Sequence, residues 1–151
     1  MFRGISALLM DSKGRVAVPT RYHETLQNEA GQMVMTVDTQ ALCLLLYPLS
    51  EWNIIEEKIA ALPTLNPAAR RIQRLLVGHA TDVELDGNGR VLIPPVLREY
   101  AQLDKKVMWV GQGKKFEIWS ELGWQEERDA WFSDKDQGEG ELPAELKQLS
   151  L

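Results

Sequence analysis

The chain has 151 residues, of which 44% are hydrophobic and 26% are charged, and its formal net charge is −5. This composition is typical of a globular protein and excludes a wholly disordered chain. A negative charge argues at first against nucleic acid, because affinity for DNA comes largely from basic side chains that neutralise phosphates. The charge is uneven, however. Residues 117–151 hold ten acidic and three basic residues, whereas residues 1–116 hold twelve acidic and fourteen basic ones.

Membrane-spanning and secreted classes are also excluded by the sequence pattern. The longest apolar run, Ala41–Tyr47, has seven residues, whereas a spanning helix needs about 20. No basic start leads into an apolar stretch with a small-residue cleavage site, as in a secretory signal. The single cysteine, Cys43, lies in an apolar run and is predicted to be a buried hydrophobic residue. These features predict a cytoplasmic protein.

An internal repeat is the most informative feature of the chain. The segment MDSKGRVAVP (residues 10–19) matches LDGNGRVLIP (residues 85–94) at an offset of 75. Further along, LYPLSEW (residues 46–52) matches IWSELGW (residues 118–124) at an offset of 72. Two matches in the same order indicate two copies of a unit of about 50 residues, each too small to be very stable alone. We therefore expect the copies to pair about a pseudo-twofold axis and to share one core.

Each copy has the same predicted order of elements. An apolar strand (residues 6–10 or 82–85) leads into a turn with Asp and Gly, and a short alternating strand then ends at a proline. A short helix follows, with Thr20 as the N-cap in the first copy and Pro94-Pro95 at its start in the second. Two strands close each unit, at residues 33–37 and 43–47 and at residues 107–110 and 116–119.

Two helices are predicted between the copies, the first capped by Ser50 and the second by Asn66 followed by a proline. A further helix continues from Trp124 through Phe132. Residues 133–140 have the composition of a loop, and spaced leucines after them indicate a short terminal helix. The predicted organisation is repeat 1 at residues 5–52, connecting helices at 53–79, repeat 2 at 80–124, and a C-terminal helix and acidic tail at 125–151.

No catalytic, metal or cofactor site is predicted. The two histidines, His23 and His79, are far apart in the sequence and belong to no cluster with zinc-ligand spacing. The phosphate-binding loop motif and the Gly-x-Ser-x-Gly elbow of hydrolases are missing from the sequence. We therefore expect neither an enzyme nor a small-molecule substrate.

The two Asp-x-x-x-Arg motifs, DSKGRVAVP (residues 11–19) and DGNGRVLIP (residues 86–94), resemble those of the AbrB-like, swapped-hairpin DNA-binding superfamily. The chain is similar, more narrowly, to the MraZ family of bacterial transcriptional regulators, through MFRG (residues 1–4), LLYP (residues 45–48) and RRIQRLLVGHA (residues 70–80). The resemblance covers residues 1–125. It implies an α+β, β-rich fold in which two tandem AbrB-like β-α-β-β units form a pseudo-dimeric swapped-hairpin barrel with flanking helices.

The resemblance also implies a function and its partners. It implies a nucleoid-associated transcriptional regulator that forms a ring-like homo-oligomer. This regulator binds double-stranded DNA at short direct promoter repeats upstream of its own division and cell-wall gene cluster. The motif positions of the family fall on Asp11, Lys13 and Arg15 in the first copy and on Asp86 and Arg90 in the second.

The first copy is predicted to carry the DNA-binding face. Residues 1–25 hold four basic residues against two acidic ones, whereas residues 78–103 hold two basic against four acidic. Lys13 and Arg15 are expected to contact DNA, with Arg3 and Arg21 as flanking phosphate contacts. Arg15 has a second interpretation, in which it pairs with the turn aspartate and braces the turn. A structural role in the turns is expected for the following residues: Asp11, Gly14, Asp86, Gly89 and Arg90.

Two other functions stay open at this point. The acidic overall charge also fits a ring-forming scaffold that binds a protein partner and little DNA. In an antitoxin-like role, the acidic tail would bind a basic toxin. A steep salt dependence of DNA affinity favours the regulator, and a partner lost on deletion of residues 133–151 favours the antitoxin.

Overall fold

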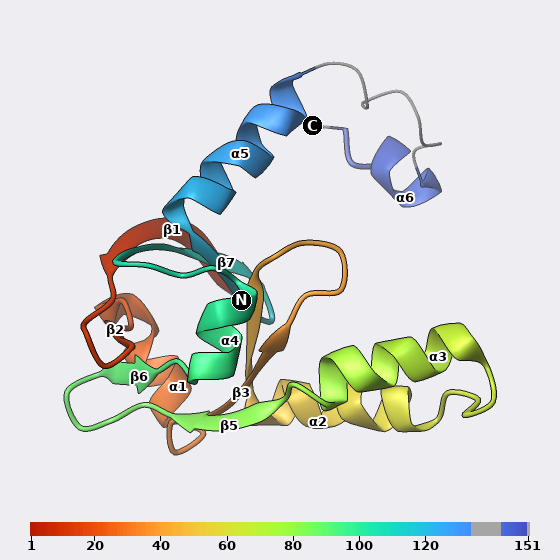
Figure 1. The fold of residues 1–151 in the computed structure, drawn as a ribbon, viewed down its shortest axis with the longest axis horizontal. Coiled ribbons are helices and arrows are strands. Elements are labelled where there is room, and N and C mark those ends of the chain that lie inside the picture. Colours follow the sequence, from red (N-terminus) through yellow and green to blue (C-terminus); the bar gives the residue numbers. More distant parts are fainter. Residues whose placement is uncertain (134–142, 151) are drawn as a thin grey trace. The chain divides into compact units, whose positions relative to one another are not determined.

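The computed structural model describes residues 1–133 and 143–150. It divides into two compact units, Met1–Glu121 and Leu122–Leu151. The first unit contains the two sequence repeats and every named strand of the described residues. Figure 1 shows this unit as strands with short helices around them and one pair of helices that extends away from the strands. The mixed α+β fold class is as predicted.

Eight strands build the first unit. The first repeat supplies four of them: β1 (Phe2–Leu9), β2 (Arg15–Ala17), β3 (Gln32–Val37) and β4 (Leu44–Pro48). The second repeat supplies the other four: β5 (Thr81–Glu84), β6 (Arg90–Leu92), β7 (Lys106–Gly113) and β8 (Phe116–Ser120). Six strands form an antiparallel sheet in the order β1-β7-β8-β4-β3-β5, while β2 and β6 form a separate two-stranded ribbon. With the short ribbon strand counted, each repeat has the order β-β-α-β-β.

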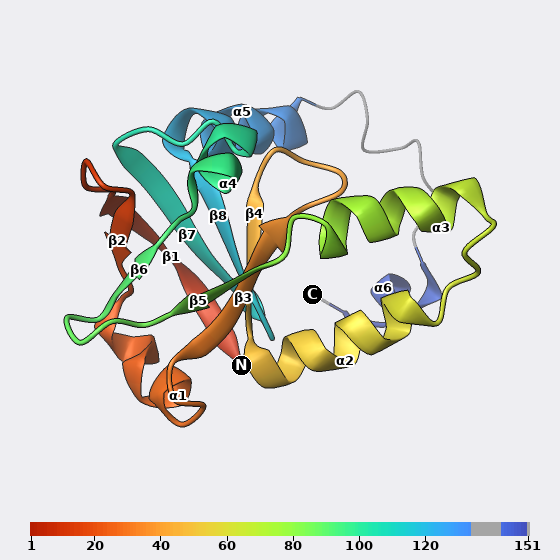
Figure 2. The ribbon, with the colours of Figure 1, turned by 60° about the horizontal axis from the view of Figure 1, so that its bottom comes forward.

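The repeats exchange strands across a pseudo-twofold axis. Strand β1 of the first repeat pairs with β7 of the second, and β5 of the second pairs with β3 of the first. In the ribbon, Val16 pairs with Val91, which is its equivalent at the offset of 75. Strands β4 and β8 meet in the same way, because Leu45 pairs with Glu117, its equivalent at the offset of 72. The axis therefore passes through both pairs, and the swapped-hairpin arrangement is confirmed (Figure 2).

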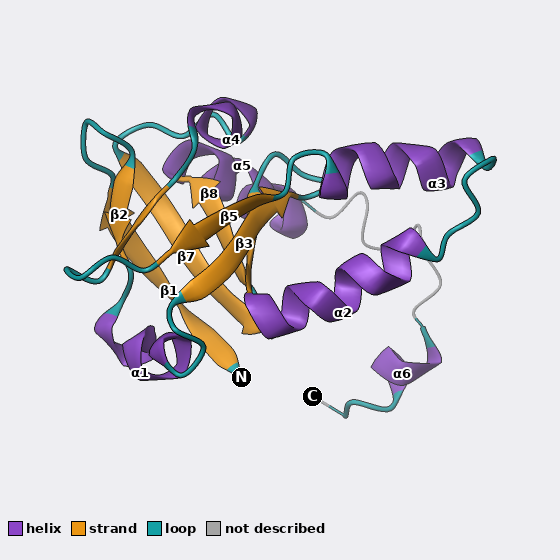
Figure 3. Cartoon of the chain, turned by 90° about the horizontal axis from the view of Figure 1, so that it is seen from below, coloured by secondary structure: helices purple, strands orange, loops and turns teal. Residues whose placement is uncertain are grey.

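One hydrophobic core lies between the sheet and the ribbon (Figure 3). Val16 and Val91 reach it from the ribbon, and both are fully buried. Trp109 and Phe116 are also fully buried, and their ring centroids lie 5.0 Å apart. Because both repeats contribute to this core, neither could bury its apolar face alone.

The helix after the ribbon strand is short in both repeats. In the first repeat it consists of a 3-10 turn, η1 (Thr20–Tyr22), and α1 (His23–Gln27). In the second repeat it is α4 (Pro95–Tyr100). The prediction that Thr20 caps this helix was wrong. Thr20 is the first residue of η1, and the N-cap position is taken by Pro19, which has an extended ψ of 134° and no polar side chain that could cap the segment.

The connecting helices form the arm that extends from the strands in Figures 1 and 2. It consists of α2 (Leu49–Ala60), α3 (Pro67–Ile72) and a π-helical turn, η2 (Gln73–Val77). Asn66 caps α3 as predicted, because its side chain accepts hydrogen bonds from two backbone N–H groups. The predicted Ser50 cap of α2 was wrong. The backbone N–H of Ser50 instead donates to Oε1 of Glu29, at 3.0 Å, from another part of the repeat.

The arm is anchored to the sheet at its base. A second apolar cluster, formed by Val34, Leu45, Tyr47 and Trp52, joins α2 to β3 and β4. The buried Thr36 hydroxyl donates a hydrogen bond of 2.6 Å to the carbonyl of Leu76 in η2. This bond satisfies a backbone group that the widened π-turn presents to the sheet.

The second unit contains α5 (Glu121–Phe132), which begins at the boundary of the first unit, and α6 (Ala144–Lys147). Helix α5 begins before Trp124, the residue from which the sequence predicted it. The rings of Trp124 and Trp131 meet edge to face, with centroids 5.5 Å apart. The predicted loop lies almost entirely outside the described residues. No helix within residues 1–133 and 143–150 has the length and apolar character of a membrane span.

Candidate nucleic-acid interface

The first turn, defined as residues 11–15, is built around one aspartate. Oδ1 of Asp11 accepts hydrogen bonds from the backbone N–H groups of Lys13 and Arg15, both at 2.9 Å. The backbone of Asp11 also bonds to Gly14 and to Arg15, at 3.0 and 2.9 Å. Asp11 therefore holds the turn in shape, as the sequence predicted from its side-chain chemistry.

The second turn, defined as residues 86–90, repeats this geometry. Oδ1 of Asp86 accepts hydrogen bonds from the N–H groups of Asn88 and Arg90, at 2.8 and 2.9 Å. Gly14 and Gly89 occupy the same place in the two turns, with φ of +89° and +74°. Glycine is suited to both positions because other residues rarely adopt a positive φ.

The ribbon brings the two turns together. Side chains alternate along a strand, so the buried Val16 and Val91 leave Arg15 and Arg90 on the opposite, outer face. Nε of Arg15 donates to Oδ2 of Asp11 at 2.8 Å. Nε of Arg90 lies 3.6 Å from Oδ2 of Asp86, and its Nη1 lies 3.9 Å from Oδ2 of Asp11 in the other repeat. Each arginine side chain stays 31% exposed, so both remain accessible to a ligand.

Both turn aspartates are held in the ionised form. The backbone N–H of Arg15, helped by its side chain and by the N–H of Lys13, lowers the pKa of Asp11 from 3.8 to about 2. The backbone N–H of Arg90 leads the causes that lower the pKa of Asp86. Hydrogen bonds to a carboxylate favour its charged form. The aspartates therefore stabilise the turns and neutralise part of the arginine charge over the whole physiological pH range.

Each turn is covered by a residue from the opposite repeat. A Cβ atom placed on Gly14 would lie 2.7 Å from Cζ of Arg98, which belongs to α4. A Cβ atom placed on Gly89 would lie 2.4 Å from Cε1 of His23, which belongs to α1. His23 and Arg98 are equivalent at the offset of 75. Sequence reasoning missed this relation because it counted charges along each copy, and the offset was the signal that could have found it.

Neighbouring strands add further charge at the first turn. The N–H of Met10 donates to the carbonyl of Lys105 at 2.7 Å, and Leu9 pairs with Lys106. At the second turn, the N–H of Leu85 donates to the carbonyl of Gly31, and Glu84 pairs with Gln32. Lys105 and Lys106 are both exposed. The exchange of strands thus places two lysines of the second repeat beside the turn of the first.

The four predicted DNA contacts fall into two groups. Lys13 is exposed on the first turn, beside Arg15. Arg3 is exposed at the other end of β1, which at 3.3 Å per residue lies about 25 Å along the strand from the turn. Arg21 lies with Arg3 and not with the turn, because its Nη2 donates to Ser6 Oγ at 2.8 Å and packs against Gly4. The structure therefore brings Lys13 and Arg15 together, and separates them from Arg3 and Arg21.

Comparisons with known proteins agree with the repeat and with the fold. The model of the family described as "MraZ protein, putative antitoxin-like" matches residues 1–75 and again residues 76–137. Proteins named Transcriptional regulator MraZ from Coxiella burnetii and Legionella pneumophila are each 53% identical over 152 aligned positions, covering 100% of both chains. A protein of the same name from Halorhodospira halophila is 49% identical over the same length. The chain therefore belongs to the MraZ family.

Proposed function

We propose that this protein is a sequence-specific, double-stranded-DNA-binding transcriptional regulator. The observation that carries the proposal is the pair of Asp-braced turns on one pseudo-symmetric ribbon, with Arg15 and Arg90 on its outer face. Relatives that match the whole chain bear the name of a transcriptional regulator, which supports the same function. DNA affinity rises when basic side chains replace the counterions of phosphates, and a rigid turn fixes where such side chains meet the duplex.

Lys13 and Arg15 are the proposed main DNA contacts. Lys13 is exposed at the tip of the first turn, and the ion pair with Asp11 sets the direction of Arg15 without covering its side chain. The two interpretations of Arg15 are therefore compatible, because Nε can brace the turn while the terminal nitrogens meet DNA. Arg3 and Arg21 are proposed phosphate contacts at a separate place on the duplex, with Arg3 about 25 Å from the turn along β1.

We further propose that the protein forms a ring-like homo-oligomer and acts in the cytoplasm, at the nucleoid. Its proposed target is a set of short direct repeats upstream of its own division and cell-wall gene cluster. A single subunit offers few basic contacts against the 6–10 phosphates that DNA-binding proteins commonly neutralise. Repetition of the same face around an oligomer would multiply affinity for a repeated site. Exposed apolar residues on β1, Ile5 at 55% and Leu9 at 72%, support association between copies.

A footprint on the DNA upstream of the protein's own gene, at two salt concentrations, tests this function. We expect protection in regular short repeats and a steep loss of affinity at the higher salt concentration. A flat salt response would contradict the regulator and favour a protein-interaction scaffold.

The antitoxin-like role has one specific observation in its favour, which is the wording of the matched family description. It predicts a basic protein partner that depends on the acidic tail. Binding of such a partner by the full chain, lost on deletion of residues 133–151 while DNA binding persists, is the result expected for this second function.

A further inference from the structure

We propose that the DNA-binding surface of the first turn is composite, and that Arg98, Lys105 and Lys106 of the second repeat complete it. This inference rests on the proposed DNA-binding function and deepens it, because it identifies side chains outside the Asp-x-x-x-Arg motif as part of the site. It also gives the strand exchange a role in binding, beyond its role in the fold.

Arg98 is the central residue of this composite surface. It lies on α4, and its guanidinium packs against Gly14 so closely that a Cβ atom there would lie 2.7 to 2.8 Å from Cζ, Nε and Nη1. Its Nε is buried and has no hydrogen-bond partner within residues 1–133 and 143–150. Arg15, in contrast, has Asp11 as an ion-pair partner. In the part of the chain that the structure describes, no acidic side chain forms an ion pair with Arg98. Its guanidinium is half-buried against the turn, so the part that stays exposed can meet an anion that reaches the turn, such as a phosphate of the duplex.

Lys105 and Lys106 extend the same surface. The carbonyl of Lys105 accepts a hydrogen bond from Met10, the residue before the turn, and Lys106 pairs with Leu9. Both lysines are exposed, as is Lys13 on the turn itself. The first turn is thus surrounded by basic side chains from both repeats: Lys13, Arg15, Arg98, Lys105 and Lys106. The acidic side chains close to the same turn include Asp11, which pairs with Arg15, and Asp86, which interacts electrostatically with Arg15.

The second turn provides an internal comparison. Its equivalent positions are occupied by His23 in place of Arg98, and by Gly31 and Gln32 in place of the two lysines. Its remaining charged residues are Glu84, Asp86 and Arg90. The backbone is the same at both turns, so the side chains decide which turn attracts DNA. They differ within the turns, where Asn88 stands in place of Lys13, and in the residues supplied across the axis.

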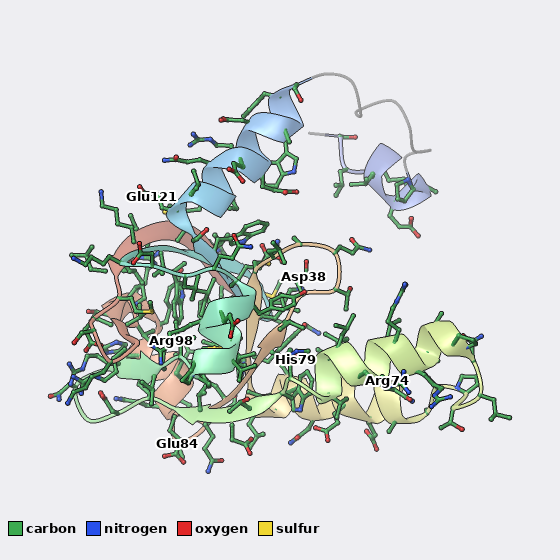
Figure 4. All side chains as sticks on the ribbon, viewed as in Figure 1. Asp38, Arg74, His79, Glu84, Arg98 and Glu121 are labelled. Atoms are coloured by element: carbon green, nitrogen blue, oxygen red, sulfur yellow. The ribbon has the colours of Figure 1, made fainter. Side chains whose placement is uncertain are left out.

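The experiment is a titration of a labelled duplex from upstream of the protein's own gene, at several salt concentrations, with the full chain. We compare Arg98→Gln and the double variant Lys105→Gln/Lys106→Gln with Arg74→Gln. The control removes one positive charge from the arm, as Arg98→Gln does at the turn. Figure 4 shows Arg98 beside the strands and Arg74 on the arm. We expect each lost phosphate contact to lower the salt slope by about 1, and Arg74→Gln to leave both slope and affinity unchanged.

A gain-of-charge variant tests the same idea in the opposite direction. His23→Arg/Gln32→Lys gives the second turn two of the three basic side chains that the first turn receives from the opposite repeat. We expect this variant to bind the duplex more tightly and with a steeper salt dependence. If it does not fold, Gln32→Lys alone changes an exposed residue and is expected to act in the same direction.

The outcomes separate the two proposals. If the unaltered chain does not bind the duplex, or if Arg15→Ala binds as tightly as the unaltered chain, the proposed function fails. If Arg15→Ala weakens binding but Arg98→Gln and the double lysine variant do not, only the composite surface is overturned. Arg98→Lys, which keeps the charge, is expected to retain most of the affinity. Equal loss in Arg98→Lys and Arg98→Gln, with a lowered melting temperature in both, would assign Arg98 to folding and not to DNA.

Discussion

The first turn (residues 11–15) and the second turn (residues 86–90) have the same backbone but different surroundings. In each, an aspartate accepts two backbone N–H groups and a glycine has a positive φ. Arg98 covers the first turn and His23 covers the second. The first arginine makes a hydrogen-bonded ion pair of 2.8 Å with its aspartate, whereas Arg90 is shared between two carboxylates at 3.6 and 3.9 Å.

The difference teaches that a duplicated fold can hold the geometry of two sites constant while their charges diverge. The hydrogen bonds across the axis are equivalent in the two halves. Val18 donates to Gly89 and Ile93 donates to Gly14, both at 2.9 Å. These bonds involve only backbone atoms, so substitutions at the side chains that surround the turns leave the ribbon intact. The first turn could therefore specialise for DNA and the second for support.

Arg15→Ala is expected to have the largest effect on DNA binding. The substitution removes a charged contact at the proposed centre of the site, at a cost of about 1–3 kcal/mol for each subunit that contacts DNA. Arg90→Ala, at the equivalent place in the second turn, is expected to cost much less. A mobility-shift titration of both variants checks this order, and equal losses would show that the two turns contribute alike.

Gly14→Ala and Gly89→Ala form a matched pair with opposite main effects. Both force alanine into a left-handed conformation, at about 1–2 kcal/mol each. At Gly89 the new Cβ also meets the His23 ring, which the carbonyl of Val18 fixes through a hydrogen bond of 2.7 Å. At Gly14 it meets the flexible end of Arg98, which can move away.

We therefore expect Gly89→Ala to lower the melting temperature more, and Gly14→Ala to weaken DNA binding more. Thermal unfolding and a DNA titration on the same preparations separate the two effects. If Gly14→Ala lowers the melting temperature but keeps the full affinity for DNA, the proposed difference between the two turns is contradicted.

Ile5→Glu is expected to act on assembly, with a smaller and indirect effect on each DNA contact. Ile5 is 55% exposed on β1, an edge strand of the sheet, and lies on the same face as Leu9. A charge there disfavours contact between copies. Light scattering is expected to show a smaller particle. The variant is expected to lose more affinity for a multi-repeat duplex than for a duplex with a single site. An unchanged particle mass would remove β1 from the proposed interface.

The smallest expected effect concerns pH and the turn aspartates. The pKa of Asp11 in the folded chain, about 2, lies below its ordinary value of 3.8. The ionised form therefore adds stability above pH 3.8, and this contribution disappears as the pH falls towards 2. Asp11→Asn keeps the Oδ1 acceptor but loses the charge. Unfolding temperatures of both chains should differ at pH 5 and converge near pH 2, and a constant difference would contradict this role.

Local features of the fold could be predicted from the sequence because they depend on neighbouring residues. The Asp11 turn and the Asn66 cap both involve partners within a few positions. The role of Ser50 could not be predicted, because it is not a cap and its N–H donates to Glu29, which lies 21 positions away. The Thr20 cap was wrong for a local reason, because the helical segment begins at Thr20 and the preceding Pro19 takes the N-cap position.

The sequence by itself determined that there are two copies, that each carries a turn braced by aspartate, and that the net charge of −5 hides a basic body and an acidic end. Only the tertiary structure decided which residues meet at each turn. Strand exchange places Lys105 and Arg98 beside residues 10–14, some 90 positions earlier in the chain. Charge counted along the sequence gives the first turn only its own basic residues. The fold adds those of the second repeat, because pairing across the axis and not chain order sets proximity.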